Sequence, residues 1–236
     1  MTLIAALRCR EGVVFCSDSR QTRGARGRRL ARSARKVYEP RHGWLLAAAG
    51  AQDVAQEFAL RLQRTRGLVT DADRLELKSQ LQALLRGLRE DPGIEGRSDH
   101  VEFLLAWWPR DARKPVALHL LSAGAAEWVD GWAFGGTALG IEIASFAVST
   151  MRYLDPARLT MEQARMVAMK VLRDAIETSV EGIGGDVQMA TLGRGGVDLI
   201  EATEMRGLHD AVDLWERRCA ELLRGRTDQV IQIYDR

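Results

Sequence analysis

The feature that most constrains the fold of this chain is the alternation of paired strand-like runs with paired helix-like runs. Apolar runs at 2–9 and 12–18 flank a tight turn, and a second pair follows at 36–39 and 43–49. From residue 51 to the Pro92-Gly93 turn, apolar residues recur at helical spacing in two successive segments. The first part of the chain is therefore predicted to pass from four strands to two helices.

The rest of the chain repeats this scheme. Three further strands are expected, followed by a helix, a longer helix that opens at the capping box Thr160-Met161-Glu162-Gln163, a hairpin and a last helix with an apolar stripe. The expected ranges are 101–108, 115–121 and 125–132 for the strands, 138–151 and 161–181 for the helices, 187–192 and 197–201 for the hairpin, and 208–222 for the stripe.

Blocks of this kind predict an α+β chain in which two antiparallel sheets pack face to face and helices cover each outer side. This architecture is a four-layer αββα sandwich. No repeat or flexible linker divides the sequence, so we expect a single domain over 1–236, with a C-terminal helix and tail from about 207.

Composition limits the classes of protein to consider. The chain has 236 residues, 46% of them hydrophobic, and no apolar run approaches the length of a membrane span. Cys9, Cys16 and Cys219 lack metal-ligand spacing. We therefore expect a cytoplasmic protein with no membrane partner, no metal site and no cofactor.

The net charge of +2 hides a basic segment between Arg20 and Lys36. No aromatic residue lies between Gln21 and Arg35 to stack against bases, so the segment is predicted to be a solvated loop and no nucleic-acid partner is expected.

Thr2 is the first candidate for catalysis. An N-terminal threonine supplies both a hydroxyl nucleophile and, in its own α-amine, a base that titrates near neutral pH. Thr2 acquires this role only if Met1 is removed, and a small second residue permits that removal. We therefore expect the mature protein to begin at Thr2.

Three short motifs follow Thr2. They are Asp18-Ser19-Arg20 after a strand, Ala34-Arg35-Lys36-Val37, and Ala48-Ala49-Gly50 before a helix. With this order of motifs the chain resembles the proteasome β-subunit family of N-terminal-nucleophile (Ntn) threonine peptidases, and its length and C-terminal helix resemble the bacterial HslV/Anbu type. The resemblance implies a threonine-type endopeptidase that hydrolyses peptide bonds within a self-compartmentalising homo-oligomer.

Residue by residue, the resemblance implies that Thr2 is the nucleophile, Asp18 orients Lys36, and Lys36 lowers the proton affinity of the nucleophile. Gly50 would donate its backbone N–H to the oxyanion. The implied substrate-binding residues are Gln21, Thr22, Ala48 and Gln52. Ala48 would form the pocket floor, where a small residue leaves room for a large apolar side chain.

Two departures from the family pattern keep other functions open. Gly135-Gly136-Thr137 stands where the family has Gly-Ser-Gly, and Gly184-Gly185 arrives late after Arg173-Asp174, in the region of Ser179 and Glu181. One alternative is a catalytically degenerate, proteasome-like scaffold subunit, and another is an Ntn amidase acting on a small-molecule amide. The implied partners are a peptide or unfolded protein substrate and further copies of the chain, and an ATPase unfoldase stays open.

Overall fold

The computed structural model describes most of the chain, and it divides into two compact units, Met1–Ile200 and Glu201–Arg236. The described residues are 2–23, 30–65, 68, 74–94, 101–109, 115–120, 125–151, 154–178 and 183–234. The prediction of a single domain over 1–236 stays a prediction.

The first unit contains two five-stranded antiparallel sheets. The order of the first sheet is β10-β1-β2-β11-β12. Its strands are β1 (Leu3–Arg8), β2 (Val13–Asp18), β10 (Trp132–Gly136), β11 (Val187–Gly193) and β12 (Gly196–Leu199). The predicted N-terminal and C-terminal hairpins therefore lie side by side, because β2 pairs with β11.

The second sheet is a meander in the order β5-β6-β7-β8-β9. Its strands are β5 (Val37–Arg41), β6 (Trp44–Ala49), β7 (Glu102–Trp107), β8 (Val116–Leu120) and β9 (Ala126–Trp128). The single strand predicted over 125–132 is wrong. After β9 the chain crosses to the first sheet, where the Arg8 N–H donates to the Gly131 carbonyl at 2.9 Å just before β10.

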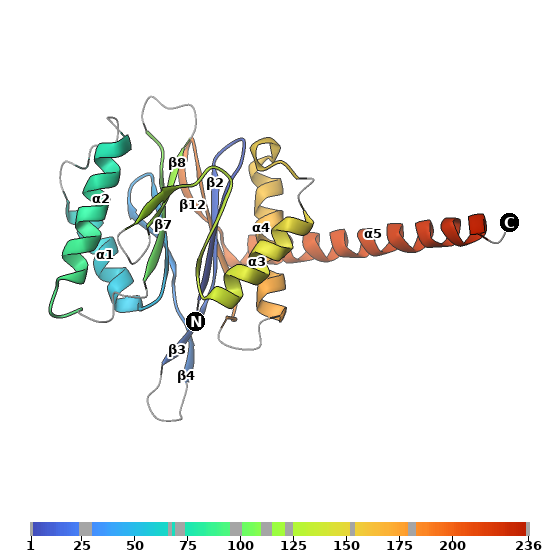
Figure 1. Ribbon diagram of the computed structural model, residues 1–236, viewed down its shortest axis with the longest axis horizontal. Coiled ribbons are helices and arrows are strands. Elements are labelled where there is room, and N and C mark those ends of the chain that lie inside the picture. Colours follow the sequence, from blue (N-terminus) through green and yellow to red (C-terminus); the bar gives the residue numbers. More distant parts are fainter. Residues whose placement is uncertain are drawn as a thin grey trace. The chain divides into compact units, whose positions relative to one another are not determined.

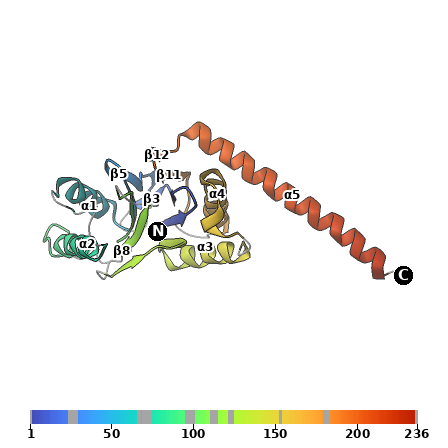
Figure 2. The ribbon, with the colours of Figure 1, turned by 90° about the horizontal axis from the view of Figure 1, so that it is seen from above.

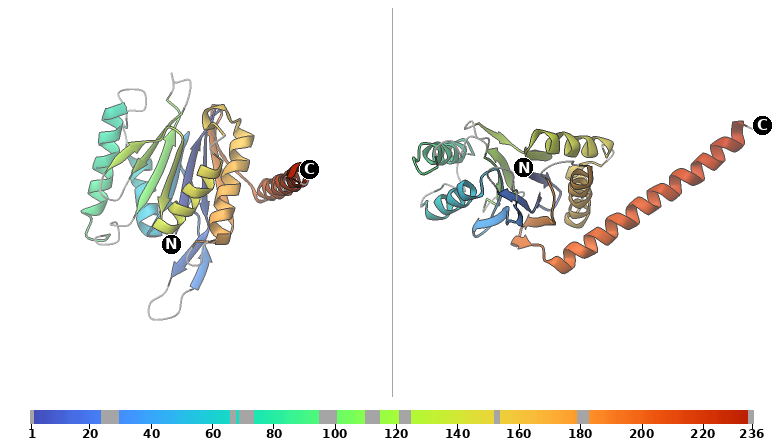
Figure 3. Two further views of the ribbon diagram at one scale, coloured as in Figure 1. Left: turned by 45° about the vertical axis from the view of Figure 1, so that its right-hand side comes forward. Right: turned by 90° about the horizontal axis from the view of Figure 1, so that it is seen from below.

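The basic segment is not a simple loop. Two short strands, β3 (Arg20–Arg23) and β4 (Leu30–Ser33), pair antiparallel within it. They extend past the end of the two sheets (Figure 3). Charge composition alone favoured a loop, because a run of like charges is usually solvated.

The strand β6 shows how the two apolar layers arise. Successive side chains of a strand point to opposite faces. Trp44, Leu46 and Ala48 belong to one apolar cluster, which they share with helix residues such as Phe58. Leu45 and Ala47 belong to the other, which they share with the first sheet. A strand buried on both faces needs an uninterrupted apolar run, which explains the sequence Trp-Leu-Leu-Ala-Ala-Ala.

Helix pairs lie on the outer side of each sheet (Figures 1 and 2). The first pair, α1 (Gln52–Arg64) and α2 (Arg74–Arg89), covers the β5–β9 sheet, and Phe58 of α1 stacks on Phe103 at 4.2 Å between ring centroids. The second pair, α3 (Ala138–Thr150) and α4 (Met161–Thr178), covers the sheet that contains β1 and β2.

The predicted capping box is confirmed at the start of α4. The Gln163 N–H donates to Thr160 Oγ1 at 3.2 Å, and the Thr160 N–H donates to Gln163 Oε1 at 3.0 Å. A short 3-10 helix, η2 (Pro156–Arg158), precedes it.

The second unit is the helix α5 (Ala202–Tyr234), which begins five residues before the predicted boundary at about 207. Within the described part of the chain, no helix is both long enough and apolar enough to cross a membrane.

Candidate active site

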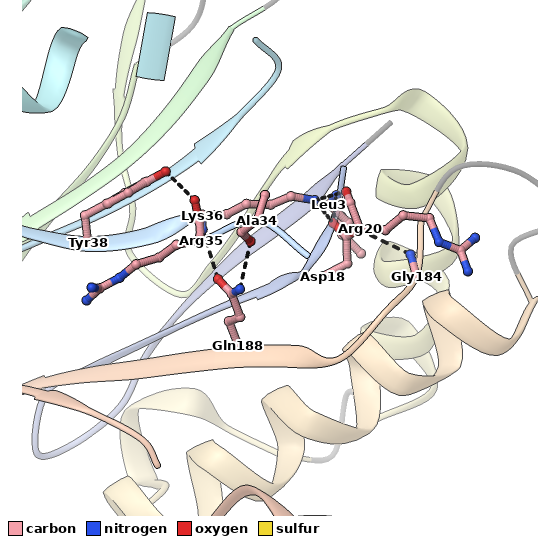
Figure 4. A network of polar contacts seen from close by, with 9 residues as sticks. All are labelled: Leu3, Asp18, Arg20, Ala34, Arg35, Lys36, Tyr38, Gly184 and Gln188. Atoms are coloured by element: carbon pink, nitrogen blue, oxygen red, sulfur yellow. Dashed lines mark hydrogen bonds and ion pairs between the residues drawn. The ribbon is translucent and has the colours of Figure 1, made fainter. Parts of the chain in front are cut away.

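The carboxylate of Asp18 is the centre of the candidate site. It lies at the end of β2 and is fully buried. Its Oδ1 accepts from the Leu3 N–H at 2.9 Å and from Lys36 Nζ at 2.8 Å, and its Oδ2 accepts from the Gly184 N–H at 3.2 Å (Figure 4). A buried carboxylate is tolerated only when it is paired and hydrogen-bonded, and one ammonium and two amides meet that requirement.

Lys36 reaches this carboxylate from the other sheet. It immediately precedes β5, is 7% exposed, and also donates from Nζ to the carbonyl of Arg20 at 2.8 Å. Burial lowers the pKa of Lys36, and the charge and hydrogen bond of Asp18 oppose that effect without cancelling it. The ammonium is therefore held in a fixed place and releases its proton more readily than a solvated lysine does.

Thr2 lies at the same end of the sheet. It is 7% exposed and directly precedes Leu3, whose N–H donates to Asp18. Its carbonyl accepts from the Thr137 N–H at 3.0 Å, which extends the pairing of β1 with β10. The structure thus places Thr2, Asp18 and Lys36 in one neighbourhood, with Asp18 Oδ1 bridging Lys36 and the residue after Thr2.

The backbone at Gly136 leaves no room for a side chain. Its φ is +122°, and a Cβ at this position would lie 2.0 Å from the carbonyl oxygen of Thr2. Any side chain would therefore displace the Thr2 backbone or the end of β10. The neighbouring Thr137 is partly buried, and its hydroxyl has no hydrogen-bond partner within the described residues.

Gly50 stands between β6 and α1 with a φ of +108°, a conformation that suits glycine. It is exposed, whereas Ala49 before it is buried. The predicted oxyanion role requires a backbone N–H that a ligand can reach, and the exposure of this strand-to-helix turn is compatible with that role. Across the sheet, Ala49 pairs with Glu102, whose carboxylate contacts Gly136.

The predicted substrate-binding residues occupy three different settings. Ala48 is 4% exposed within the cluster under α1, and its N–H donates to the Lys36 carbonyl at 2.9 Å. Gln52 is the first residue of α1, and its side chain is among the groups that oppose the rise in the pKa of Tyr38 caused by burial. The backbones of Gln21 and Thr22 lie in β3, while their side chains fall outside the described set.

Two partners of the site were not among the predicted site residues. Gly184 donates to Asp18, and its carbonyl accepts from the Arg20 N–H at 2.8 Å. Gln188 of β11 clamps the segment before β5, because its Oε1 accepts from the Lys36 N–H at 2.9 Å and its Nε2 donates to the Ala34 carbonyl at 2.8 Å (Figure 4). A polar residue between buried Val187 and Met189 was the available signal for Gln188.

The carboxylate of Asp174 is paired with Lys170 on the same helix, α4. Lys170 Nζ donates to Asp174 Oδ1 at 2.6 Å and to Oδ2 at 2.5 Å. Ser179 and Glu181, the other residues considered for this region, lie outside the described residues.

Comparison with known proteins identifies the fold. No protein-family model matches the chain, and no curated protein matches it. Among solved structures, Anbu (ancestral beta-subunit) from Yersinia bercovieri is similar, with a TM-score of 0.73 at 15% identity over 95% of this chain and 97% of that one. An Anbu (Gly-1) mutant from Hyphomicrobium sp. strain MC1 is also similar, with a TM-score of 0.68 at 15% identity over 95% of this chain and 100% of that one. The chain therefore has the fold of Anbu, the ancestral beta-subunit, as the resemblance of its motifs predicted.

Proposed function

We propose that this chain is an N-terminal threonine peptidase of the proteasome type that hydrolyses peptide bonds. One observation carries the proposal: Asp18 Oδ1 accepts at once from Lys36 and from the N–H of the residue after Thr2. This arrangement fixes a buried ammonium beside the start of β1. Replacing a buried ion pair by apolar residues of the same volume is often neutral or stabilising, because the pair must be desolvated. Stability alone therefore gives little reason to keep Lys36 and Asp18 buried together.

The chemistry follows from these groups. After removal of Met1, the α-amine of Thr2 takes the proton from Oγ1 as Oγ1 attacks the carbonyl carbon of the peptide bond. The Gly50 N–H stabilises the oxyanion, and the Lys36 ammonium stabilises negative charge as it develops on Oγ1. The C–N bond then breaks, the amine leaves with the proton, and an ester on Thr2 remains. Water hydrolyses that ester and restores the hydroxyl.

The remaining features of the proposal follow from the same resemblance. The two sheets and two helix pairs would form the αββα sandwich of Ntn hydrolases. Copies of the chain would assemble into a ring or an open ring stack in the cytoplasm. The small residue Ala48 would admit a large apolar side chain on the substrate, with Gln21, Thr22 and Gln52 contacting the peptide. An unfoldase partner stays open.

A catalytically degenerate scaffold is the second candidate, and two observations favour it. Gly136 replaces the family serine, and Asp174 is paired with Lys170 on its own helix. A scaffold would need neither a free Thr2 amine nor a charged Lys36. The amidase alternative has no observation of its own in its favour.

The test is covalent labelling of Thr2 by an electrophilic peptide, followed by intact-mass and peptide mapping. We expect the mature protein to lack Met1 and to be labelled on Thr2. Thr2→Ala should abolish labelling and peptide hydrolysis, because no other residue there supplies both amine and hydroxyl. Thr2→Ser, which keeps both groups, is the matched control and should retain labelling. Retained Met1, or hydrolysis that survives in Thr2→Ala, would refute the peptidase assignment.

A further inference from the structure

A carboxylate from the opposite sheet lies against the backbone that supports Thr2. Glu102 begins β7, where it pairs with Ala49, the residue before Gly50. Its side chain is 24% exposed, so it is mostly shielded from water. Glu102 therefore stands between the predicted oxyanion donor and the end of β10.

The contacts of Glu102 are specific. Its Oε2 accepts from the Gly136 N–H at 2.9 Å, and His119 Nε2 lies 3.5 Å from the same oxygen. A Cβ on Gly135 would lie 2.8 Å from this oxygen, so the carboxylate packs closely on the glycine backbone. Burial raises the pKa of Glu102, but His119 and the Gly136 N–H lower it by more, which keeps the carboxylate ionised near neutral pH.

The backbone turns at the end of β10, and we call Gly135-Gly136 the corner. The side of this corner away from Glu102 contacts Thr2. The missing Cβ of Gly136 leaves room for the Thr2 carbonyl, and that carbonyl accepts from the Thr137 N–H. A displacement of Gly136 therefore moves the backbone to which Thr2 is hydrogen-bonded.

The position of β10 makes an outside acceptor necessary. This strand is the edge of its sheet in the described topology, with β1 as its neighbour there. A backbone N–H that points away from β1 at a sheltered edge needs another partner, since an unpaired buried donor costs about 1–3 kcal/mol. Glu102 supplies that partner from the second sheet.

On the basis of the proposed function, we propose that Glu102 is a positioning residue for the nucleophile. Its carboxylate fixes the Gly135-Gly136 corner, and the corner fixes the backbone of Thr2 between Asp18 and Gly50. Glu102 thereby holds the Thr2 backbone in place through the Gly135-Gly136 backbone. This chain has glycine, rather than the serine of the family pattern, at position 136.

The experiment compares labelling kinetics of mature wild type, Glu102→Ala and Glu102→Gln with the same electrophilic peptide. We expect Glu102→Ala to lower the maximal labelling rate by about tenfold to a hundredfold with little change in the concentration for half-maximal rate, because the nucleophile is misplaced while the peptide still binds. Glu102→Gln keeps an oxygen acceptor for the Gly136 N–H and should recover most of that loss. Exchange of the Gly136 amide should accelerate in Glu102→Ala alone.

The matched control is Glu162→Ala, which removes an exposed carboxylate from the first turn of α4, away from Glu102 and His119, and should change neither rate nor exchange. Glu102→Asp, which withdraws the carboxylate by one methylene, replaces the alanine variant if that variant does not fold. Labelling of Glu102→Ala or Glu102→Asp at the wild-type rate would overturn the role of Glu102 alone, as would equal losses in alanine and glutamine variants. Absence of Thr2 labelling in wild type would overturn the peptidase proposal and this role with it.

Discussion

The layer between α1, α2 and the β5–β9 sheet is buried and apolar, whereas the cluster around Asp18 is equally buried and polar. In the first region, Phe58 and Phe103 are fully buried and stack on each other. In the second region, Asp18 is fully buried and depends on one ammonium and two amides. Apolar stabilisation scales with buried area and has no direction, whereas a buried charge is stable only while each partner stays in place.

This difference separates stability from chemistry. A change in the apolar layer away from Ala48 should lower the free energy of unfolding and leave the reaction unaffected. A change in the polar cluster should affect the reaction first, because its groups lie beside Thr2. The following predictions test that separation, from the largest expected effect to the smallest.

Lys36→Ala should lower the rate of Thr2 labelling by about a hundredfold to a thousandfold, the usual cost of removing one electrostatic contact to a developing charge. Lys36→Arg should also lower the rate of Thr2 labelling, because a planar guanidinium cannot occupy the space between Asp18 and the Arg20 carbonyl. Single-turnover labelling measures both, with thermal melts as the folding control. Wild-type labelling in either folded variant would contradict the proposed role of Lys36.

Gln188→Ala should slow labelling by about tenfold to a hundredfold, since it frees the Ala34–Lys36 backbone from β11 and allows the ammonium to shift. Gln188→Glu has nearly the same shape but places an oxygen against the Ala34 carbonyl, and should also slow the reaction. Exposed Asp186 on the same segment offers the control, Asp186→Ala, which should react normally. If both Gln188 variants matched wild type, the clamp would have no part in placing Lys36.

Phe58→Leu should lower the free energy of unfolding by about 1–2 kcal/mol through lost burial and a small cavity, with no change in the labelling rate below the melting temperature. Denaturant unfolding measures the free energy and labelling kinetics measure the rate, both on the same protein sample. A slowed reaction in a fully folded Phe58→Leu protein would show that the two regions are coupled.

The smallest expected effect concerns pH. The pKa of Lys36 in the folded state lies below its ordinary value of 10.5, so between the two values the unfolded chain binds more protons than the folded one. The contribution of Lys36 to stability should therefore rise with pH across that window. Unfolding free energies of wild type and Lys36→Met from pH 8 to 11 test this sign, with wild type gaining relative to the variant. A difference that is flat or falls with pH would contradict the burial of a charged lysine.

Several elements of the fold could be predicted from local sequence. The doubly apolar runs of β6 and β7, the helical period of α1 and the capping box of α4 reflect interactions within a few residues, and the structure contains all of them. The strands β3 and β4 were missed because a run of arginines dominated the pattern. The boundary between β9 and β10 was missed because the sequence does not reveal which sheet a strand joins.

For the site, the sequence by itself determined the candidate set of Thr2, Asp18, Lys36 and Gly50, because these residues belong to short ordered motifs. Only the tertiary structure decided what holds them. Gly184 lies 166 residues from Asp18 and Gln188 lies 152 from Lys36, while Glu102 reaches Gly136 across 34 residues from another sheet. The first contact follows from the pairing of β11 with β2, and the other two arise from the packing of one sheet against the other. Local propensity and spacing carry no record of that packing, since hydrogen bonds between sheets depend on three-dimensional register.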